Sequence, residues 1–459
     1  MRRSLILAAT FAFAANSAAV AAEPQLETIL ELPGNSIDLT KTKTPGANIN
    51  RNGFFSDIFY DSRTGWYALS DRGPGGGLLS YGTRVQRFSF VYDANGDISD
   101  YKVTKTIRFT DENGAPFNGL NPGLLNLNPA VLGNSFDPEG IVVGQGGHLY
   151  VSDEYGPSVY EFSSSGQFIR AFDPPSRLLP RVNDALEFVA DPPQTGRQGN
   201  RGYEGLAINP LKTKLYAILQ DPLQEEGLSP PASPANPGRR SRNVRIVEYD
   251  IKTGQSERQF IYQLDTLLDI NGRDPSATQF PANQQGRSIG ASSIYAISNT
   301  EFLVLERDNR GRGVDAAAAL PTAPAKPLHK RIYKIDISEA DDFADVSLVG
   351  INDGLPDELK PVSKELFLDL LGAIGGAGHW LPEKLEGFAV GPLLPGGKRL
   401  FIAGTDNDYS VTQSGAGEQF DICIDSGMTT STQVTLGSAC PAGKALIPAL
   451  LMSFTGELN

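Results

Sequence analysis

A Glu-Gly pair that introduces an apolar segment occurs three times in this chain, at Glu139, Glu204 and Glu386. Each time, a second apolar segment leading to an aspartate follows at short range. Two looser copies begin at Asp57, which keeps an acid at the glutamate position, and at Ser292, which does not. If such repeats fold around a common axis, the carboxylates that recur at one position are brought together at that axis.

Each copy is followed by further alternating, aromatic and β-branched segments with glycine-containing turns, the pattern of a β-hairpin. Four strands per repeat, recurring after roughly 65 to 95 residues, indicate the blades of a propeller. We therefore predict an all-β fold, a single β-propeller with five readable four-stranded blades and room for a sixth. Residues 445–454 and 26–32 are the predicted outer strands of the last blade. Short helices are expected in the insertions, at 182–189 and 363–374.

The first 22 residues have the pattern of a secretory signal peptide. Arg2 and Arg3 form a positive start, residues 5–15 are apolar, and small residues follow up to Ala22. The propeller domain is then predicted to span residues 23–459. No later segment is apolar for long enough to cross a bilayer. We expect a soluble, exported protein, in the periplasm or outside the cell.

Cys423 and Cys440 are the two cysteines of the chain, and they bracket a polar stretch. In an oxidising compartment a local disulfide is expected between them, worth about 3 kcal/mol in the chain-entropy model. Two free thiols are the alternative. Neither cysteine is followed by the arginine of a cysteine-phosphatase loop, so the sequence does not indicate catalysis by cysteine.

Charge and motif content exclude several chemistries. A formal net charge of −13 does not suit nucleic-acid binding, which depends on basic residues that neutralise phosphates. The three histidines lie far apart in the sequence, and neither a nucleophile elbow nor a phosphate-binding P-loop is present. Hard oxygen ligands are abundant, which favours calcium or magnesium over zinc.

Five motifs stand out, at residues 70–76, 136–141, 152–156, 200–207 and 384–389. Together they resemble the phytase-like family known as "esterase-like activity of phytase". The resemblance runs from about residue 50 to the C-terminus. It implies an exported β-propeller with clustered acids, and it suggests hydrolysis of a small-molecule phosphate ester.

The repeats and the resemblance together predict a metal site at one mouth of the central channel, holding calcium or magnesium. Its candidate ligands are Asp71, Glu139, Asp153, Glu154, Glu204, Glu386 and Asp406. Glu139, Glu204 and Glu386 are also the catalytic candidates. The metal would polarise a phosphate oxygen and activate water. The alternative for each acid is to cap a strand or to pair with a nearby arginine.

Basic residues beside these acids are candidates for binding the substrate's phosphate, since an arginine can contact it through two N–H groups. They are Arg72, Arg201, Arg307, Arg310 and Lys384. Surface ion pairing is the alternative role for them. Two other functions remain open: a calcium-dependent lactonase of the gluconolactonase type, whose propeller also has a Glu-Gly start, and a non-catalytic binding propeller stabilised by metal.

Overall fold

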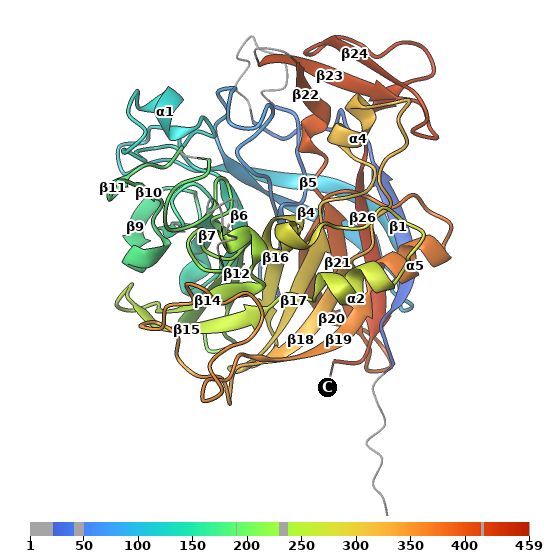
Figure 1. Cartoon of the computed structure of the whole chain (residues 1–459). Helices are drawn as coiled ribbons and strands as arrows, with labels where there is room; N and C mark the ends of the chain where they lie inside the picture. The colour runs from blue at the N-terminus through green and yellow to red at the C-terminus, as the bar shows by residue number, and fades with distance from the viewer. Residues whose placement is uncertain (1–21, 41–49, 190, 229–236, 415–416, 459) are drawn as a thin grey trace, which may run out of the picture.

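The computed structural model describes residues 22–40, 50–189, 191–228, 237–414 and 417–458 (Figure 1). Residues 1–21 of the predicted signal peptide lie outside this set. Five four-stranded antiparallel sheets follow the sequence repeats. The fold is the predicted β-propeller, in which each repeat supplies one sheet and its first strand is the innermost.

The first four sheets are each formed by consecutive strands. Sheet one contains β2 (Asp57–Asp61), β3 (Gly65–Leu69), β4 (Arg84–Tyr92) and β5 (Ile98–Arg108). Sheet two contains β6 (Pro138–Val143), β7 (Leu149–Asp153), β8 (Ser158–Phe162) and β9 (Phe168–Phe172). Sheet three contains β12 (Tyr203–Ile208), β13 (Lys214–Leu219), β14 (Asn243–Asp250) and β15 (Ser256–Gln263). Sheet four contains β16 (Ile289–Ala296), β17 (Glu301–Asp308), β18 (Lys330–Asp336) and β19 (Ser363–Asp369).

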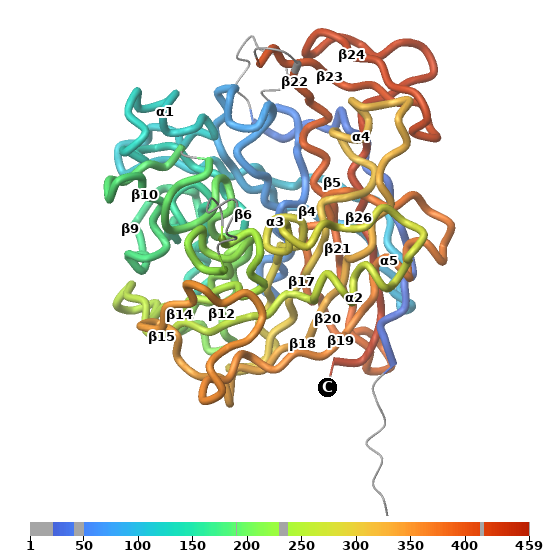
Figure 2. The backbone as a smooth tube through the Cα atoms, viewed as in Figure 1, coloured from blue at the N-terminus to red at the C-terminus, as the bar shows by residue number. Residues whose placement is uncertain are grey.

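The fifth sheet joins the two ends of the described chain. Its order is β20 (Leu385–Leu393), β21 (Arg399–Thr405), β26 (Ala449–Gly456) and β1 (Gln25–Leu32). β1 and β26 are antiparallel, so the N-terminal strand runs beside the C-terminal strand, as Figure 2 shows. The two outer strands predicted for the last blade are thereby confirmed.

The innermost strands approach one another very closely. β6 contacts β12, β12 contacts β16, β16 contacts β20, and β2 contacts both β6 and β20. A Cβ added at Gly140 would lie 2.5 Å from the backbone nitrogen of Leu206, and one at Gly205 would lie 2.9 Å from that of Ile294. The glycine of the Glu-Gly pair is therefore required because the next sheet leaves no room for a side chain.

Asp57 occupies the glycine position of the first sheet, and its predicted alignment with the glutamates is wrong by one residue. One carboxylate oxygen accepts a hydrogen bond from the backbone N–H of Ile141 (2.9 Å), and the other accepts from the hydroxyl of Ser293 (3.1 Å). Asp57 thus links sheets one, two and four at the axis. Burial raises its pKa well above the ordinary range.

Apolar side chains pack between neighbouring sheets. One cluster of buried residues extends from the first sheet to the fourth, and two smaller clusters lie against the fifth. On the side where sheets five and one meet, Phe55, Trp66 and Phe88 pack with Ile402 and Leu451. The core therefore continues past the point where the last repeat meets the first.

A separate sheet is inserted between β21 and β26. It consists of β22 (Val411–Ser414), β23 (Glu418–Ile424), β24 (Ser431–Thr435) and β25 (Ala445–Leu446). Figure 1 shows β22, β23 and β24 at the top, beside α4 (Val314–Ala318). The predicted disulfide between Cys423 and Cys440 is present there. Residues that could have formed a sixth blade thus form an insertion within the fifth sheet.

Helices are short and lie in the connections. They are α1 (Pro122–Leu125), α2 (Leu267–Gly272), α3 (Gln285–Ser288), α4 and α5 (Leu370–Gly376). The helix predicted at 182–189 is wrong, because β10 (Arg181–Val182) and β11 (Ala185–Leu186) pair there. The helix predicted at 363–374 begins only at Leu370, after β19. None of the helices in the described ranges is both long and apolar enough to cross a membrane.

The close approach at the axis predicts that Gly140→Ala lowers the free energy of unfolding by about 1–3 kcal/mol, as overpacking typically does. Gly272→Ala is the control, because a Cβ at Gly272 would meet nothing within 4 Å. Urea unfolding of both variants measures the difference. An equal effect at both positions would contradict this account of the Glu-Gly pair.

Candidate active site

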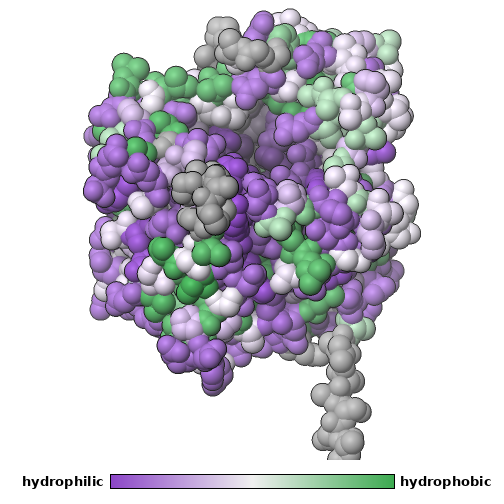
Figure 3. Space-filling model, viewed as in Figure 1, coloured by the Kyte–Doolittle hydropathy of each residue, from purple (hydrophilic) through white to green (hydrophobic). Residues whose placement is uncertain are grey.

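The acids of the repeats gather at one end of the axis, which we call the mouth. In each sheet the start of the innermost strand pairs with the end of the second strand: Pro138 pairs with Asp153, and Leu385 pairs with Thr405. The glutamate at the first strand and the aspartate after the second therefore lie at the same end. The space-filling view shows a hollow flanked by hydrophilic residues below the inserted sheet (Figure 3).

Asp71, Asp137 and Glu139 form a buried group at the mouth. One oxygen of each carboxylate lies within 4.8 Å of those of the other two. Glu139 is 8% exposed, and no hydrogen bond or ion pair reaches its carboxylate from the described residues. Asp137 was not among the predicted ligands, although it belongs to the motif that contains Glu139. Because Asp137 and Glu139 are two residues apart, their side chains point to the same side of an extended chain.

Arg72 holds Asp137 in place. Its backbone N–H donates to one carboxylate oxygen of Asp137 (3.0 Å), and its guanidinium donates to the other (2.7 Å). The same guanidinium donates to the side-chain oxygen of Asn200 and lies 3.8 Å from Glu154. Arg72 thus connects sheets one and two with the loop that leads into sheet three.

Burial makes ionisation of this acid group unfavourable. It raises the pKa of Asp71 to about 7, with a further contribution from the charge of Asp137. It also raises the pKa of Asp137 to about 7, despite the opposing charge of Arg72. The pKa of Glu139 is raised well above its ordinary range, by burial and then by Asp137. A bound cation would favour the ionised forms of all three.

A second acid group is partly compensated by a lysine of the chain. Asp71, Asp406 and Asp408 also lie close enough to share a ligand. The ammonium group of Lys384, however, donates to Asp408 (2.6 Å) and to Asp406 (3.3 Å). Lys384 and Asp406, predicted to bind substrate and metal respectively, thus contact each other.

Arg307 binds Ser292, which stands in the fourth sheet where the other repeats carry glutamate. Its Nε donates to the hydroxyl of Ser292 (2.8 Å), and its guanidinium donates to Glu386 and lies 3.8 Å from Glu204. Glu204 also accepts a hydrogen bond from Gln220. Arg307 is therefore a partner of Glu204 and Glu386 but not of Glu139.

Glu154 lies among the acids of the mouth, where burial and then the charge of Glu154 raise the pKa of Glu204, whereas Asp153 has a structural role. The carboxylate of Asp153 accepts from the backbone N–H groups of Asp137 (3.0 Å), Tyr155 (3.1 Å) and Gly156 (3.0 Å). It thereby fixes the backbone that carries Asp137. Its oxygens are used within the protein, which is the strand-capping role named as the alternative for these acids.

The predicted basic residues separate into two sets. Arg201 and Arg307 both lie at the mouth. Arg201 is 3.2 Å from Asp221. Arg310 instead donates to the carbonyl of Thr278 and lies 3.4 Å above the ring centre of Phe280. Arg287 also lies at the mouth. No repeat or motif pointed to it, because it comes from a connection between sheets.

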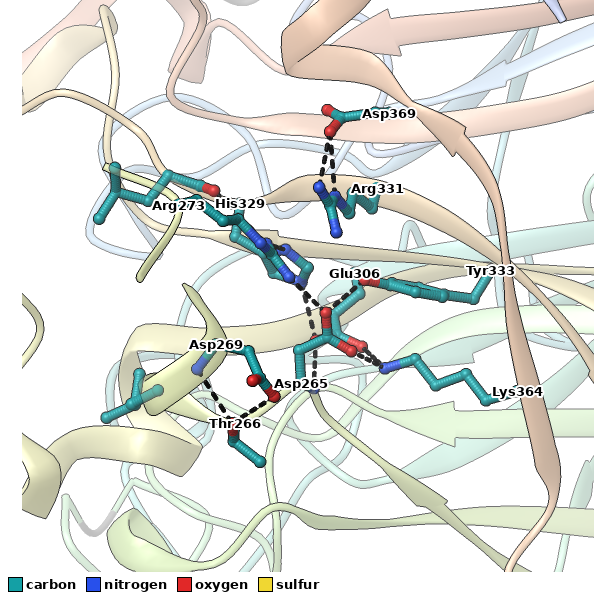
Figure 4. A network of polar contacts seen from close by, with 12 residues as sticks. Asp265, Thr266, Asp269, Arg273, Glu306, His329, Arg331, Tyr333, Lys364 and Asp369 are labelled. Atoms are coloured by element: carbon teal, nitrogen blue, oxygen red, sulfur yellow. Dashed lines mark hydrogen bonds and ion pairs between the residues drawn. The ribbon is translucent and has the colours of Figure 1, made fainter. Parts of the chain in front are cut away.

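A third group of possible metal ligands lies between sheets three and four (Figure 4). Glu306 accepts from His329 (2.8 Å) and Lys364 (2.6 Å), while Lys364 also donates to Asp265 (2.7 Å). Although burial opposes ionisation, Lys364 and His329 lower the pKa of Glu306 to about 2. This network carries its own cation and connects two sheets, in contrast to the group around Glu139.

The fold and this mouth define a β-propeller with an acid-lined site. The chain belongs to the phytase-like family: the family model described as "esterase-like activity of phytase" matches residues 50–409. A curated relative from Arthroderma benhamiae, described as an uncharacterized secreted protein, is 31% identical over 419 residues. The match covers 76% of this chain and 78% of that relative.

Solved structures that match this chain have lower sequence identity. A virginiamycin B lyase from Staphylococcus aureus is 9% identical, with coverage of 93% of this chain and 99% of that one and a TM-score of 0.31. A luciferin-regenerating enzyme is 11% identical, with coverage of 90% and 95% and a TM-score of 0.30.

The raised pKa values of Asp71 and Asp137 predict how stability depends on pH without metal. Unfolded aspartates titrate near about 3.9, whereas these two titrate at about 7 when folded. Between these values the folded state binds more protons, so the free energy of unfolding falls as pH rises from 4 to 7. Urea unfolding with a chelator at pH 5 and pH 8 measures this.

Calcium should restore stability at pH 8 far more than at pH 5, because protons compete with the cation for the carboxylates. Glu139→Gln should reduce the effect of calcium. An equal effect of calcium on the wild type and on Glu139→Gln would contradict the assignment of the metal to this group.

Proposed function

We propose that this chain is an exported hydrolase of phosphate esters, with a divalent cation, calcium or magnesium, held by Asp71, Asp137 and Glu139. The observation that carries the proposal is Glu139: a carboxylate that is 8% exposed, faces two other acids and has no partner among the described residues. Membership of the phytase-like family supports hydrolase activity. The secreted relative supports export.

The donor set suits a hard cation. Calcium and magnesium prefer carboxylate oxygens, which is what these three side chains offer. Asp71 uses one oxygen for the backbone N–H of Gly73 (2.9 Å), and Glu139 keeps both oxygens free of hydrogen bonds from the described chain. Placing three such groups together without a cation is costly, since like charges oppose each other in a buried site. When bound, the cation would polarise a phosphoryl oxygen and activate water.

The remaining residues of the mouth have supporting roles in this proposal. Arg72 and Asp153 fix Asp137, one through its side chain and the other through its backbone. Arg307 holds Glu386 and lies beside Glu204, which keeps these two glutamates from repelling each other. Glu139 is thus the repeated acid left free for a ligand.

Hydrolysis is tested with protein from the exported fraction, whose intact mass should correspond to residues 23–459. Phosphate release from phytate and from a simple aryl phosphate is measured with calcium, with magnesium and with a chelator. Glu139→Gln should lower kcat/KM by at least about 100-fold, because a ligand of the catalytic cation is lost. Glu301→Gln, a surface change near Lys334, is the control.

The same assay separates the two other functions. Opening of a sugar lactone without phosphate release would favour a lactonase. A calcium-dependent rise in melting temperature with no turnover would favour a binding propeller. Phosphate release that persists in chelator and in Glu139→Gln would contradict the proposed centre.

A further inference from the structure

Three arginines converge at the part of the mouth between sheets three and four. Arg201 precedes β12, Arg287 lies in α3, and Arg307 lies near the end of β17. Together with Asp221 and Ser292 they line a small depression, which we call the arginine pocket. The sequence already indicated Arg201 and Arg307 as candidates for binding phosphate, whereas Arg287 is brought to them only by the fold.

The arginine pocket has fewer acids than basic groups. Asp221 lies 3.2 Å from Arg201 and 3.9 Å from Arg287, so that one carboxylate serves two guanidinium groups. Elsewhere at the mouth the balance is reversed, since Lys384 alone contacts both Asp406 and Asp408. Asp191 also acts on Arg287, and Arg307 lies against Glu204 and Glu386. Among the residues that line the pocket, however, three guanidinium groups face one carboxylate, which leaves room for an anionic partner.

Hydrogen-bond donors remain available in the arginine pocket. The Nε of Arg201 faces Asp221 at 3.2 Å without hydrogen-bond geometry, and no described residue accepts a hydrogen bond from the rest of the Arg201 guanidinium. The guanidinium of Arg287 donates to the backbone carbonyl of Gly199 (3.0 Å), which orients it. An oxyanion in the pocket could accept charge-assisted hydrogen bonds from these guanidinium groups.

Ser292 is what keeps the arginine pocket positive. The equivalent position carries glutamate in sheets two, three and five, at Glu139, Glu204 and Glu386. A glutamate at position 292 would supply the missing negative charge from within the chain. The fourth repeat therefore brings no carboxylate to the place where sheets two, three and five each bring one.

We infer that the arginine pocket binds one oxyanion group of the substrate and that Arg287 is a substrate-binding residue. The inference rests on the function proposed above in taking that group to be a phosphate. The open space is about 20 Å³, little more than a water requires, so one oxygen of the anionic group enters the pocket while the rest of the group lies in the mouth. Arg307, which also contacts Glu204 and Glu386, places this group beside the acids.

Binding of inorganic phosphate to the chelator-treated protein tests the inference without any turnover. Calorimetric titration at constant ionic strength should show binding to the wild type and at least tenfold weaker binding to Arg287→Gln. Arg331→Gln is the control, because Arg331 pairs with Asp369 on the outer strands of sheet four. Its phosphate affinity should equal that of the wild type.

Ser292→Glu provides a second variant that the fold should accept, since three other sheets carry glutamate at this position. It should abolish phosphate binding while leaving the unfolding temperature within the range of the wild type. With substrate, Arg287→Gln should raise KM more than it lowers kcat, as expected when binding is lost from ground state and transition state alike.

Two results would overturn the inference: no phosphate binding by the wild type at millimolar concentration, or equal affinity in the wild type and Arg287→Gln. Failure of the proposed function looks different. In that case phosphate still binds and the variants still weaken it, but no ester is hydrolysed under any metal condition.

Discussion

The narrow axis of the propeller is the constraint on which the rest of the structure depends. Five innermost strands approach so closely that the residues facing the next sheet must be glycine, as at Gly140 and Gly205, or a small polar residue with a partner. Asp57 is the exception, and its carboxylate is tolerated because it accepts hydrogen bonds from Ile141 and Ser293. Backbone spacing at the axis, more than strand propensity, therefore explains why glycine recurs in the repeat.

The same spacing forces the preceding residues together at the mouth. Glu139, Glu204 and Glu386 lie close together for this reason, and their negative charges must be compensated. The chain does this unevenly: Arg307 and Lys384 pair with acids in one part of the mouth, whereas Asp137 pairs with Arg72 and Glu139 has no partner among the described residues. Uneven compensation leaves one region that favours a cation and another, around Arg287, that favours an anion.

The sequence predicts those features that repeat. Glutamates recurring before apolar strands indicate the blades, and unpaired inner strands 386–406 require the two chain ends as partners, which β26 and β1 supply. It does not reveal Asp137 as part of the acid group or Arg287 as part of the arginine pocket, since each depends on contacts between separate segments. The alignment of Asp57 fails for a physical reason: an acid can replace either residue of the Glu-Gly pair, and only the packing at the axis distinguishes them.

A crystal structure with calcium tests the central claim most directly, because the claim concerns where a cation lies. Under conditions in which the protein hydrolyses a phosphate ester, a calcium ion is predicted between the carboxylates of Asp71, Asp137 and Glu139, with oxygen distances of about 2.3–2.6 Å. Density for calcium elsewhere at the mouth, with these three carboxylates free of metal in an active protein, would contradict the account.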